Sequence, residues 1–240
     1  MIADLWTVVW KEWKEFLAQR GTLLSMVIYL GIFAVLLPSQ NGTRWVESPL
    51  AVLNLMMIPL FLVLTTVADG FAGERERHTL DTLLASRLSD QVILLGKIVA
   101  SVAYGWGLTL AALVAAPISA AVSSGDGLHL YPAWLGISAV VFSLLLLVLV
   151  AAAGMLVSLR ASTVRQAQQI LNVGLLVIGL VVVGAISITP ERWRERIVEA
   201  IESASDAQLL AVAVAFFIAI DAAVIFIAMA RFRRPLLAVD

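Results

Sequence analysis

The sequence contains no cysteine and only two histidines. A chain without cysteine forms no disulfide, offers no thiolate to a metal ion and has no cysteine nucleophile, and its redox compartment stays open. Both histidines, His78 and His129, fall in segments that we expect to be loops. A zinc site or a serine-histidine protease site within a membrane is therefore not indicated.

Charged residues are also scarce. They make up 14% of the 240 residues, whereas hydrophobic residues make up 61%; soluble domains have about 25% and about 45–50%. The formal net charge of -1 provides no broad basic surface, so we expect no binding of nucleic acid. This composition predicts an integral membrane protein.

Long apolar runs account for this composition. A helix needs about 20 apolar residues to cross the hydrocarbon core, with a range of roughly 17–25. Six runs qualify, at residues 22–38, 50–68, 98–122, 131–159, 170–188 and 209–230. Because polar or glycine-containing segments separate them, we predict an all-α integral membrane fold in which residues 1–240 form a single domain of six transmembrane helices.

Lysine and arginine are distributed unevenly between the segments that join the spans. Basic residues close to a span are retained on the cytoplasmic side. If the N-terminus lies inside, the four outer basic residues are Arg44, Arg192, Arg194 and Arg196, and the remaining twelve of the sixteen lie inside. This distribution predicts that both termini are cytoplasmic and that the protein lies in the inner, or plasma, membrane.

The sequence has no G-x-x-x-x-G-K-[ST] phosphate-binding loop. The backbone and the lysine of that loop hold nucleotide phosphates. We therefore expect this chain to have no catalytic residue, and to bind no metal and no cofactor. An ATP-driven activity would need a second polypeptide to hydrolyse the nucleotide.

Residues 1–20 are expected to form an amphipathic helix rather than a signal peptide, because acidic residues interrupt the apolar stretch. At 100° per residue one face is apolar, and the other carries charges that we expect to lie in water. The apolar face consists of Leu5, Trp6, Val9, Trp10, Trp13, Phe16 and Leu17, and the charged face of Asp4, Lys11, Glu12, Lys14 and Glu15. Such a helix suits the inner membrane surface, as an anchor or as a docking element for a cytoplasmic partner.

The cytoplasmic segment 70–97 is too long for a turn and has two parts. Alternating charges occupy residues 74–77, and an apolar stripe suited to a short helix follows at Leu80, Leu83 and Leu84. Ser89 is a suitable cap for the next helix. We expect an amphipathic helix that a groove on a soluble protein can bind.

Three motifs in this segment carry a resemblance to a known family. They are Gly73-Glu74-Arg75-Glu76-Arg77-His78-Thr79-Leu80, Leu83-Leu84-Ala85-Ser86 and Ile93-Leu94-Leu95-Gly96-Lys97. Together they resemble the signature of ABC transporter permeases of the type-2 (type V) exporter family, in which glycine is usual at the position of His78 and proline at that of Arg87. The layout of an interfacial N-terminal helix, six spans and a polar external segment before the last span is similar too.

The resemblance implies a membrane-spanning permease subunit of an ATP-binding-cassette exporter, which moves its substrate outward by alternating access. It implies two permease protomers, as a homodimer or a heterodimer surrounded by membrane lipid, on two copies of a separate ABC ATPase subunit that binds ATP and Mg. It also implies that residues 74–86 are a coupling helix. The ATPase-coupling residues would be Glu74, Arg75, Glu76, Arg77, Thr79, Leu80, Leu83 and Leu84.

The external segment 189–206 shows a second amphipathic pattern. Thr189 is a suitable cap, and Pro190 fits the first helical position. An apolar stripe then recurs every four residues, at Trp193, Ile197 and Ile201. We predict an interfacial helix. The resemblance implies that it covers the exit of the pathway, whereas a helix that merely rests on the membrane fits the pattern equally well.

Asp221 is the one acidic residue within a predicted span. A charged carboxylate at the centre of a membrane helix costs about 2.5–3.5 kcal/mol on insertion scales and usually faces the protein interior. Because no basic residue lies within a predicted span, we favour helix packing over transport for Asp221. Asn54 and Asn172 are further candidates for lining a pathway. The alternative function is a secondary transporter or channel that uses Asp221 and an ion gradient, and the substrate stays undefined.

Overall fold

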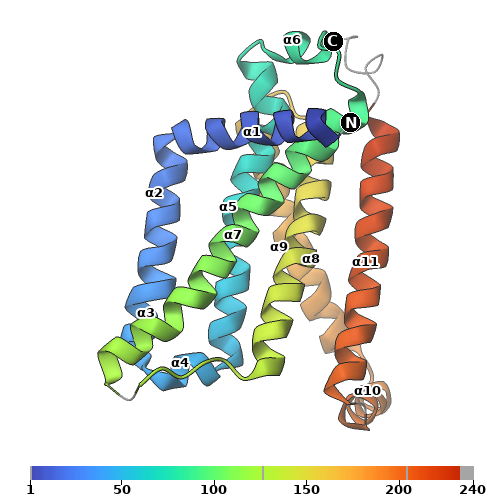
Figure 1. Ribbon diagram of the computed structural model, residues 1–240. Coiled ribbons are helices and arrows are strands. Elements are labelled where there is room, and N and C mark those ends of the chain that lie inside the picture. The colour runs from blue at the N-terminus through green and yellow to red at the C-terminus, as the bar shows by residue number, and fades with distance from the viewer. Residues whose placement is uncertain (1, 126, 204, 233–240) are drawn as a thin grey trace.

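The computed structural model describes residues 2–125, 127–203 and 205–232, and the regular structure over these residues is entirely helical. Figure 1 shows a bundle of long helices with α1 (Ile2–Ala18) lying across one end. α6 (Leu80–Leu84) lies at that same end, and α4 (Thr43–Glu47) and α10 (Glu191–Ser203) lie at the opposite end.

Six helical stretches in the described part of the chain are long and apolar enough to cross a membrane, which confirms the predicted number. The first is a continuous stretch made of α2 (Arg20–Tyr29), the π-helix η1 (Leu30–Leu36) and α3 (Leu37–Asn41). The other five are α5 (Pro49–Glu76), α7 (Asp90–Ser124), α8 (Ala133–Ser158), α9 (Val164–Ile188) and α11 (Asp206–Arg231). Both α5 and α7 extend well beyond the predicted spans at their α1 ends.

Side-chain hydroxyls cap the starts of four of these helices. The cap residues are Ser48 for α5, Ser89 for α7, Thr163 for α9 and Ser205 for α11. Each hydroxyl accepts a hydrogen bond from a first-turn N–H group, which has no acceptor within the helix. The predicted cap at Ser89 is thereby confirmed.

α5 and α8 pack closely at the centre of the bundle through small residues. A Cβ atom built on Gly154 of α8 would lie 2.5 Å from Val67 Cγ1 of α5, and one built on Gly70 of α5 would lie 2.9 Å from Met155 Sδ. The Ser158 hydroxyl of α8 donates a hydrogen bond to a carbonyl of α5 and accepts from two of its N–H groups. Close approach and interhelical hydrogen bonds hold helices together in lipid, where burial of apolar surface contributes little.

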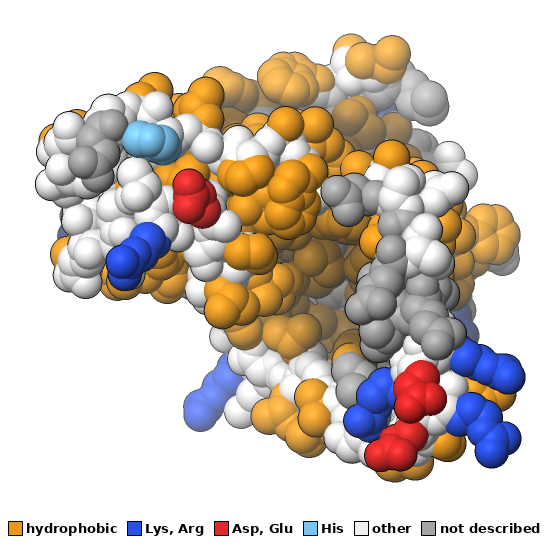
Figure 2. Space-filling model, turned by 90° about the horizontal axis from the view of Figure 1, so that it is seen from below, with side chains coloured by type: hydrophobic (Ala, Val, Ile, Leu, Met, Phe, Trp, Pro, Cys, Tyr) orange, Lys and Arg blue, Asp and Glu red, His pale blue; other side chains and the backbone are white. Residues whose placement is uncertain are grey.

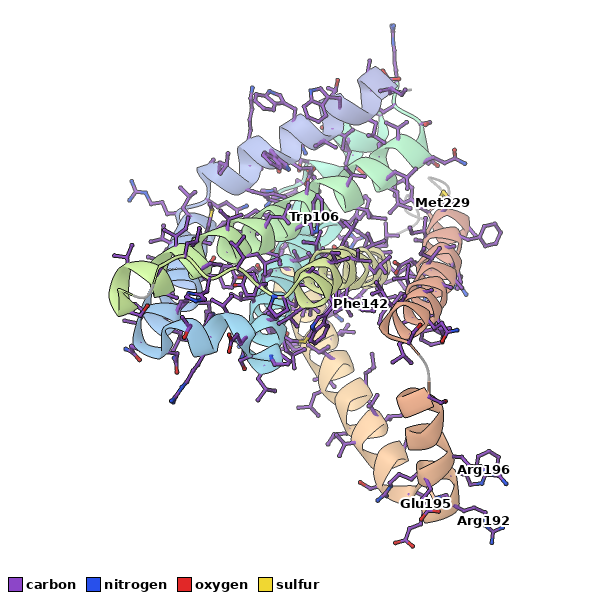
Figure 3. All side chains as sticks on the ribbon, turned by 60° about the horizontal axis from the view of Figure 1, so that its bottom comes forward. Trp106, Phe142, Arg192, Glu195, Arg196 and Met229 are labelled. Carbon is purple, nitrogen blue, oxygen red and sulfur yellow. The ribbon has the colours of Figure 1, made fainter. Side chains whose placement is uncertain are left out.

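α7 and α11 lie against other parts of α8. Trp106 Nε1 of α7 donates to Val140 O of α8 at 3.2 Å, and Phe142 of α8 meets Phe217 of α11 edge to face with ring centres 6.0 Å apart. Figure 3 shows Trp106 and Phe142 within the bundle and Met229 near one end of α11. α8 is therefore the helix that connects α5, α7 and α11.

α9 is attached mainly to α5 and diverges from α11 (Figure 3). Its C-terminal half carries exposed apolar side chains in an almost unbroken run that includes Leu176, Val177, Ile178, Leu180, Val181, Val182 and Val183. A helix that is apolar on all sides suits lipid or contact with another membrane protein.

Apolar side chains also fill the centre of the end that carries α4 and α10 (Figure 2).

α10 is a helix within the segment 189–206, and its start differs from the prediction. Pro190 precedes the helix, and its carbonyl accepts a hydrogen bond from Trp193 N at 2.9 Å. The Thr189 hydroxyl donates to Ala185 O at 2.7 Å, so Thr189 ends α9 instead of capping α10. Threonine satisfies a carbonyl at a helix end as readily as an N–H group at a helix start, and the sequence pattern does not separate the two.

The polar side of α10 is turned away from the bundle. Arg192, Glu195 and Arg196 all project outward in Figure 3, and Trp193 is exposed beside Arg196. The side chains of Ile197 and Ile201, the rest of the predicted apolar stripe, lie outside the described residues.

Candidate functional site

The segment 70–97 does not form one helix over residues 74–86 as predicted. Residues 74–76 are the last turn of α5, Arg77 ends that helix, and only Leu80–Leu84 form the separate helix α6. Alternating glutamate and arginine suit a helix end as well as a surface helix, which explains the error. α5 thus brings its terminal charges to the level where it meets α1, α7, α8 and α9.

Glu74 belongs to a buried network of ion pairs. Its carboxylate lies 3.4 Å from Lys97 Nζ of α7, and Lys97 Nζ donates to Glu12 Oε1 of α1 at 2.6 Å. Lys11 of α1 also donates to Glu74 and lies 3.1 Å from Glu15. Lys97 is 1% exposed, and Glu12 and Glu74 are 3% exposed each. The network therefore joins the end of α5 to both α1 and α7.

Pairing makes these buried charges tolerable, because an isolated buried ion is strongly unfavourable. Lys97 has two carboxylate partners, and its ammonium group lies 5.5 Å from the centre of the Phe71 ring. Burial alone would lower the pKa of Lys11, but the hydrogen bond to Glu74 and the negative charges nearby raise the pKa above its usual value. Oxygens of Glu12, Glu15 and Glu74 lie within 4.8 Å of one another, and the two ammonium groups between them make this cluster an ion-pair network.

The next two residues of α5 bind the ends of two other helices. Arg75 donates to Leu159 O at 3.0 Å and to Ala161 O, directly after the end of α8. Glu76 Oε1 accepts from Val164 N at 2.9 Å, at the start of α9. The last carbonyls and the first N–H groups of a helix lack partners within it, and its dipole favours a cation at the end and an anion at the start. Adjacent opposite charges therefore match the opposite ends of α8 and α9.

Arg77 ties the end of α5 to Asp69, which lies about two turns earlier on the same helix. Its guanidinium donates to both carboxylate oxygens of Asp69, at 3.0 and 3.2 Å. A Cβ atom built on Gly73 would lie 2.0 Å from Asp69 Oδ1, so Gly73 provides the space for this ion pair. The requirement for glycine at position 73, the first residue of the motif, is therefore steric.

The turn after α5 has the hydrogen bonds of a Schellman motif. Thr79 N donates to Glu74 O at 2.9 Å, and His78 N donates to Arg75 O at 3.1 Å. This motif needs a left-handed residue at the position of His78, and His78 has a φ of 56°. The glycine usual in the resembling family is therefore replaced by a residue that pays a conformational cost of about 1–2 kcal/mol here.

The apolar residues of α6 face the protein itself. Leu80 is buried in the main apolar cluster, and Leu83 packs against that cluster in a partly buried position. The Thr79 hydroxyl, just before α6, donates to the Glu74 carboxylate. The side chain of Leu84 lies outside the described residues. Leu80 and Leu83 thus anchor α6 to the helix bundle, and the exposed face of the segment is polar.

α1 differs from the expected arrangement, in which its charged face lies in water. Glu12 is buried, and Lys11 and Glu12 point toward Glu74 and Lys97. Gly96 of α7 permits this approach, because a Cβ atom there would lie 2.6 Å from Val8 Cγ1 of α1. Of the predicted apolar face, Val9 and Phe16 are buried, whereas Trp6, Trp10, Trp13 and Leu17 are exposed.

The three pathway candidates lie apart from this network. Asn54 is exposed on α5 and donates to Leu50 O of its own helix at 2.9 Å, and Asn172 is exposed on α9. Asp221 on α11 is 6% exposed, and neither carboxylate oxygen has a hydrogen-bond partner among the described residues. The three residues lie on three different helices, α5, α9 and α11, and their roles in transport stay predictions.

Comparison with known families agrees with this architecture. Residues 32–201, more than two thirds of the chain, match the family described as ABC-2 family transporter protein. The chain therefore belongs to the ABC-2 transporter family and is a multi-pass membrane permease of the ABC transporter class. No curated protein matches the chain.

Sequence reasoning identified Glu74 but missed its partners. The sequence pattern places Lys11 and Glu12 on a helix face that we expect to lie in water, and Lys97 at the end of the last motif. The available signal was the spacing of Lys11, Glu12 and Glu15, which share one helical face with mixed charge. Such a face is also common on exposed helices, so the sequence alone does not indicate a buried partner. The pairing with Lys97 follows from the way α1 lies across α7.

Substitution of Lys97 tests the buried network. Lys97→Met leaves Glu12 and Glu74 buried with reduced compensation, and removal of one partner of a buried pair costs about 3–5 kcal/mol. At roughly 2–4 °C per kcal/mol, we expect the thermal midpoint of the purified protein in detergent to fall by about 10 °C. Lys14→Met, at an exposed position of α1, should change it little, and adding Glu12→Gln to Lys97→Met should recover part of the loss. Equal midpoints for the two lysine variants would contradict a structural role for the network.

The left-handed turn gives a second prediction. His78→Gly removes the conformational cost at φ 56° and should raise the free energy of unfolding by about 1 kcal/mol. His129 is an exposed loop residue that does not have a positive φ, so His129→Gly should not stabilise the protein. Thermal unfolding of both variants in the same detergent makes the comparison, and stabilisation by both or by neither would refute the turn's proposed strain.

Proposed function

We propose that this chain is the permease subunit of an ABC exporter and that its segment 77–89 receives force from a separate ATPase subunit. In this proposal two permease protomers stand on two ATPase subunits, which bind ATP and Mg, and substrate moves outward by alternating access. Membership of the ABC-2 family supports the class of transporter. The observation that carries the coupling role is that Glu74, Arg75 and Glu76 bind four other helices in succession.

The segment 77–89 presents a polar surface suited to a soluble partner. Arg77, His78, Asp81, Thr82 and Arg87 are exposed. Leu80 holds α6 onto the permease from the other side. A partner would therefore bind the polar face of α6. It would push on an element that Leu80 and Leu83 already hold against the bundle.

The contacts of the α5 end provide a route for movement. A displacement of α6 pulls on the turn that follows Glu76, and the charges of residues 74–76 pass it to α1, α7, α8 and α9. Buried ion pairs and hydrogen bonds to helix ends are directional, so they transmit a tilt of α5 better than apolar contacts alone. These helices would move together as one side of an alternating-access cycle.

α1 is proposed to lie along the inner membrane surface. Its exposed tryptophans, Trp6, Trp10 and Trp13, are residues that favour the headgroup layer. Since Glu12 and Lys11 tie α1 to α5 and α7, we favour a role in positioning the coupling segment over simple anchoring. The uncovered apolar faces of α9 and α11 would contact lipid and the second protomer.

The gradient-driven alternative is not proposed. Asp221 is buried, but neither of its carboxylate oxygens has a hydrogen-bond partner among the described residues, so no relay of polar groups leads to it. The chain also belongs to a family of ABC transporters, which draw energy from ATP.

For α10, the outward direction of its charges favours a helix at the outer surface that covers the bundle's end.

The absence of cysteine allows a direct test of orientation and partner contact. Thr82→Cys places one thiol on α6, and Leu128→Cys, the matched control, places one on the exposed loop at the opposite end. In cells, a membrane-impermeant maleimide should label Leu128→Cys at least about tenfold faster than Thr82→Cys, because an unmodified bilayer blocks access to the inner surface.

The same two variants, purified with the co-expressed ATPase, should differ in cross-linking. A short thiol-to-amine cross-linker should join Thr82→Cys to the ATPase subunit and leave Leu128→Cys unlinked. Preferential labelling of Thr82→Cys from outside would reverse the orientation, and cross-linking from position 128 alone would exclude α6 as the contact.

A further inference from the structure

A cavity of about 1020 Å³ opens beside the turn that follows α5. Its walls come from the ends of α5, α8 and α11, the start of α9, and α6. Ligand sites commonly have volumes of about 300–1,000 Å³, so the cavity has room for a lipid headgroup and the start of its chains. No described side chain occupies this space.

The lining of the cavity is cationic. Arg75, Arg160 and Arg231 line it, and Asp81 is the one acidic residue among the described lining residues. Arg75 is held in place by its bonds to the end of α8. Arg160 and Arg231 are exposed and have no ion-pair partner among the described residues. Two free guanidinium groups thus face the same space as a third that is fixed.

Each of the two arginines has an apolar residue of the cavity four positions earlier in the chain. Ile227 and Arg231 share one face of α11, whereas Leu156 lies in the last turn of α8 and Arg160 in the turn that follows it, and all four line the cavity. Ile170 of α9 adds a third apolar wall. The cavity therefore has a basic rim and an apolar interior in the same order as the headgroup and chains of a membrane lipid.

We propose that this cavity binds an anionic phospholipid of the cytoplasmic leaflet. Arg160 and Arg231 hold its phosphate, because guanidinium groups bind phosphate oxygens in pairs. The acyl chains lie against Leu156 and Ile227 and extend toward α9 and α11, which diverge (Figure 3). Basic pockets between membrane helices on the cytoplasmic side have this use in other proteins. The choice of leaflet rests on the orientation in the proposed function.

The cavity also adjoins α6 and the turn that follows α5. His78, Leu80 and Asp81 also line the cavity, so a lipid bound there lies against the turn and α6. A free anion would be bound by the arginines alone, whereas a lipid also fills the apolar interior. These two ligands are therefore distinguished by the effect of a change in the apolar wall.

The test uses the purified full-length chain in a neutral detergent, with lipid retention measured by native mass spectrometry. Phosphatidylglycerol and phosphatidylcholine with the same acyl chains are compared, since they differ in headgroup charge. We expect phosphatidylglycerol to be retained at least about tenfold more strongly, at one molecule per protomer. The double variant Arg160→Gln with Arg231→Gln should abolish this preference. The matched control, Arg87→Gln with Arg165→Gln, removes two exposed arginines outside the cavity and should retain it.

A second variant, Ile227→Trp, fills the apolar wall without changing any charge, and it should weaken retention several-fold. Equal retention of both lipids, or unchanged retention in the Arg160 and Arg231 double variant, would overturn the proposal. Competition by inorganic phosphate together with an unaffected Ile227→Trp variant would assign the site to a free anion and overturn it as well. Because the measurement needs neither ATP nor the ATPase, its failure leaves the transport proposal intact.

Discussion

The position of Lys97 between Glu12 and Glu74 is the constraint on which the rest of the α1 end depends. One ammonium group at 1% exposure has carboxylates from two other helices as partners. None of the three charges is stable there without the others, so α1, α5 and α7 have to meet at this point. Gly96 makes the meeting of α1 and α7 sterically feasible, since Val8 of α1 fills the place where its Cβ atom would lie.

This arrangement changes the meaning of the charged motif at residues 74–77. Glu74, Arg75 and Glu76 are already bound to other elements of the permease, and Arg77 is bound to Asp69 of α5 itself. What is left exposed is the turn around His78 and the polar side of α6. The motif therefore acts as a joint: it fixes a small exposed segment to α1, α7, α8 and α9 at once. A membrane transporter driven by a separate subunit needs such a joint, because force applied to a flexible loop would not reach the spans.

The number of spans could be predicted from sequence because it depends on apolar length, which is a local property. The cap at Ser89 could also be predicted, since a hydroxyl before a helix has a local role. The ends of α5 and α7 could not, because Glu74 and Lys97 look like boundary charges until their partners are known. The same holds for Glu12, whose burial depends on how α1 crosses α7. His78 shows the reverse case: its departure from glycine was visible in the sequence, and the structure supplies the reason in a left-handed φ.

Transmission from the end of α5 to the far side of the membrane is measured most directly by pulsed electron resonance. Cysteine-free wild type allows spin labels at Leu50 and Ile188, exposed residues at the ends of α5 and α9 that lie opposite α1, in the complex with the ATPase. Addition of ATP and Mg should change the distance distribution between the two labels. In a Glu74→Gln background, in which the complex still assembles, that change should be lost. An ATP-dependent change that is the same with and without Glu74 would contradict the role assigned to the joint.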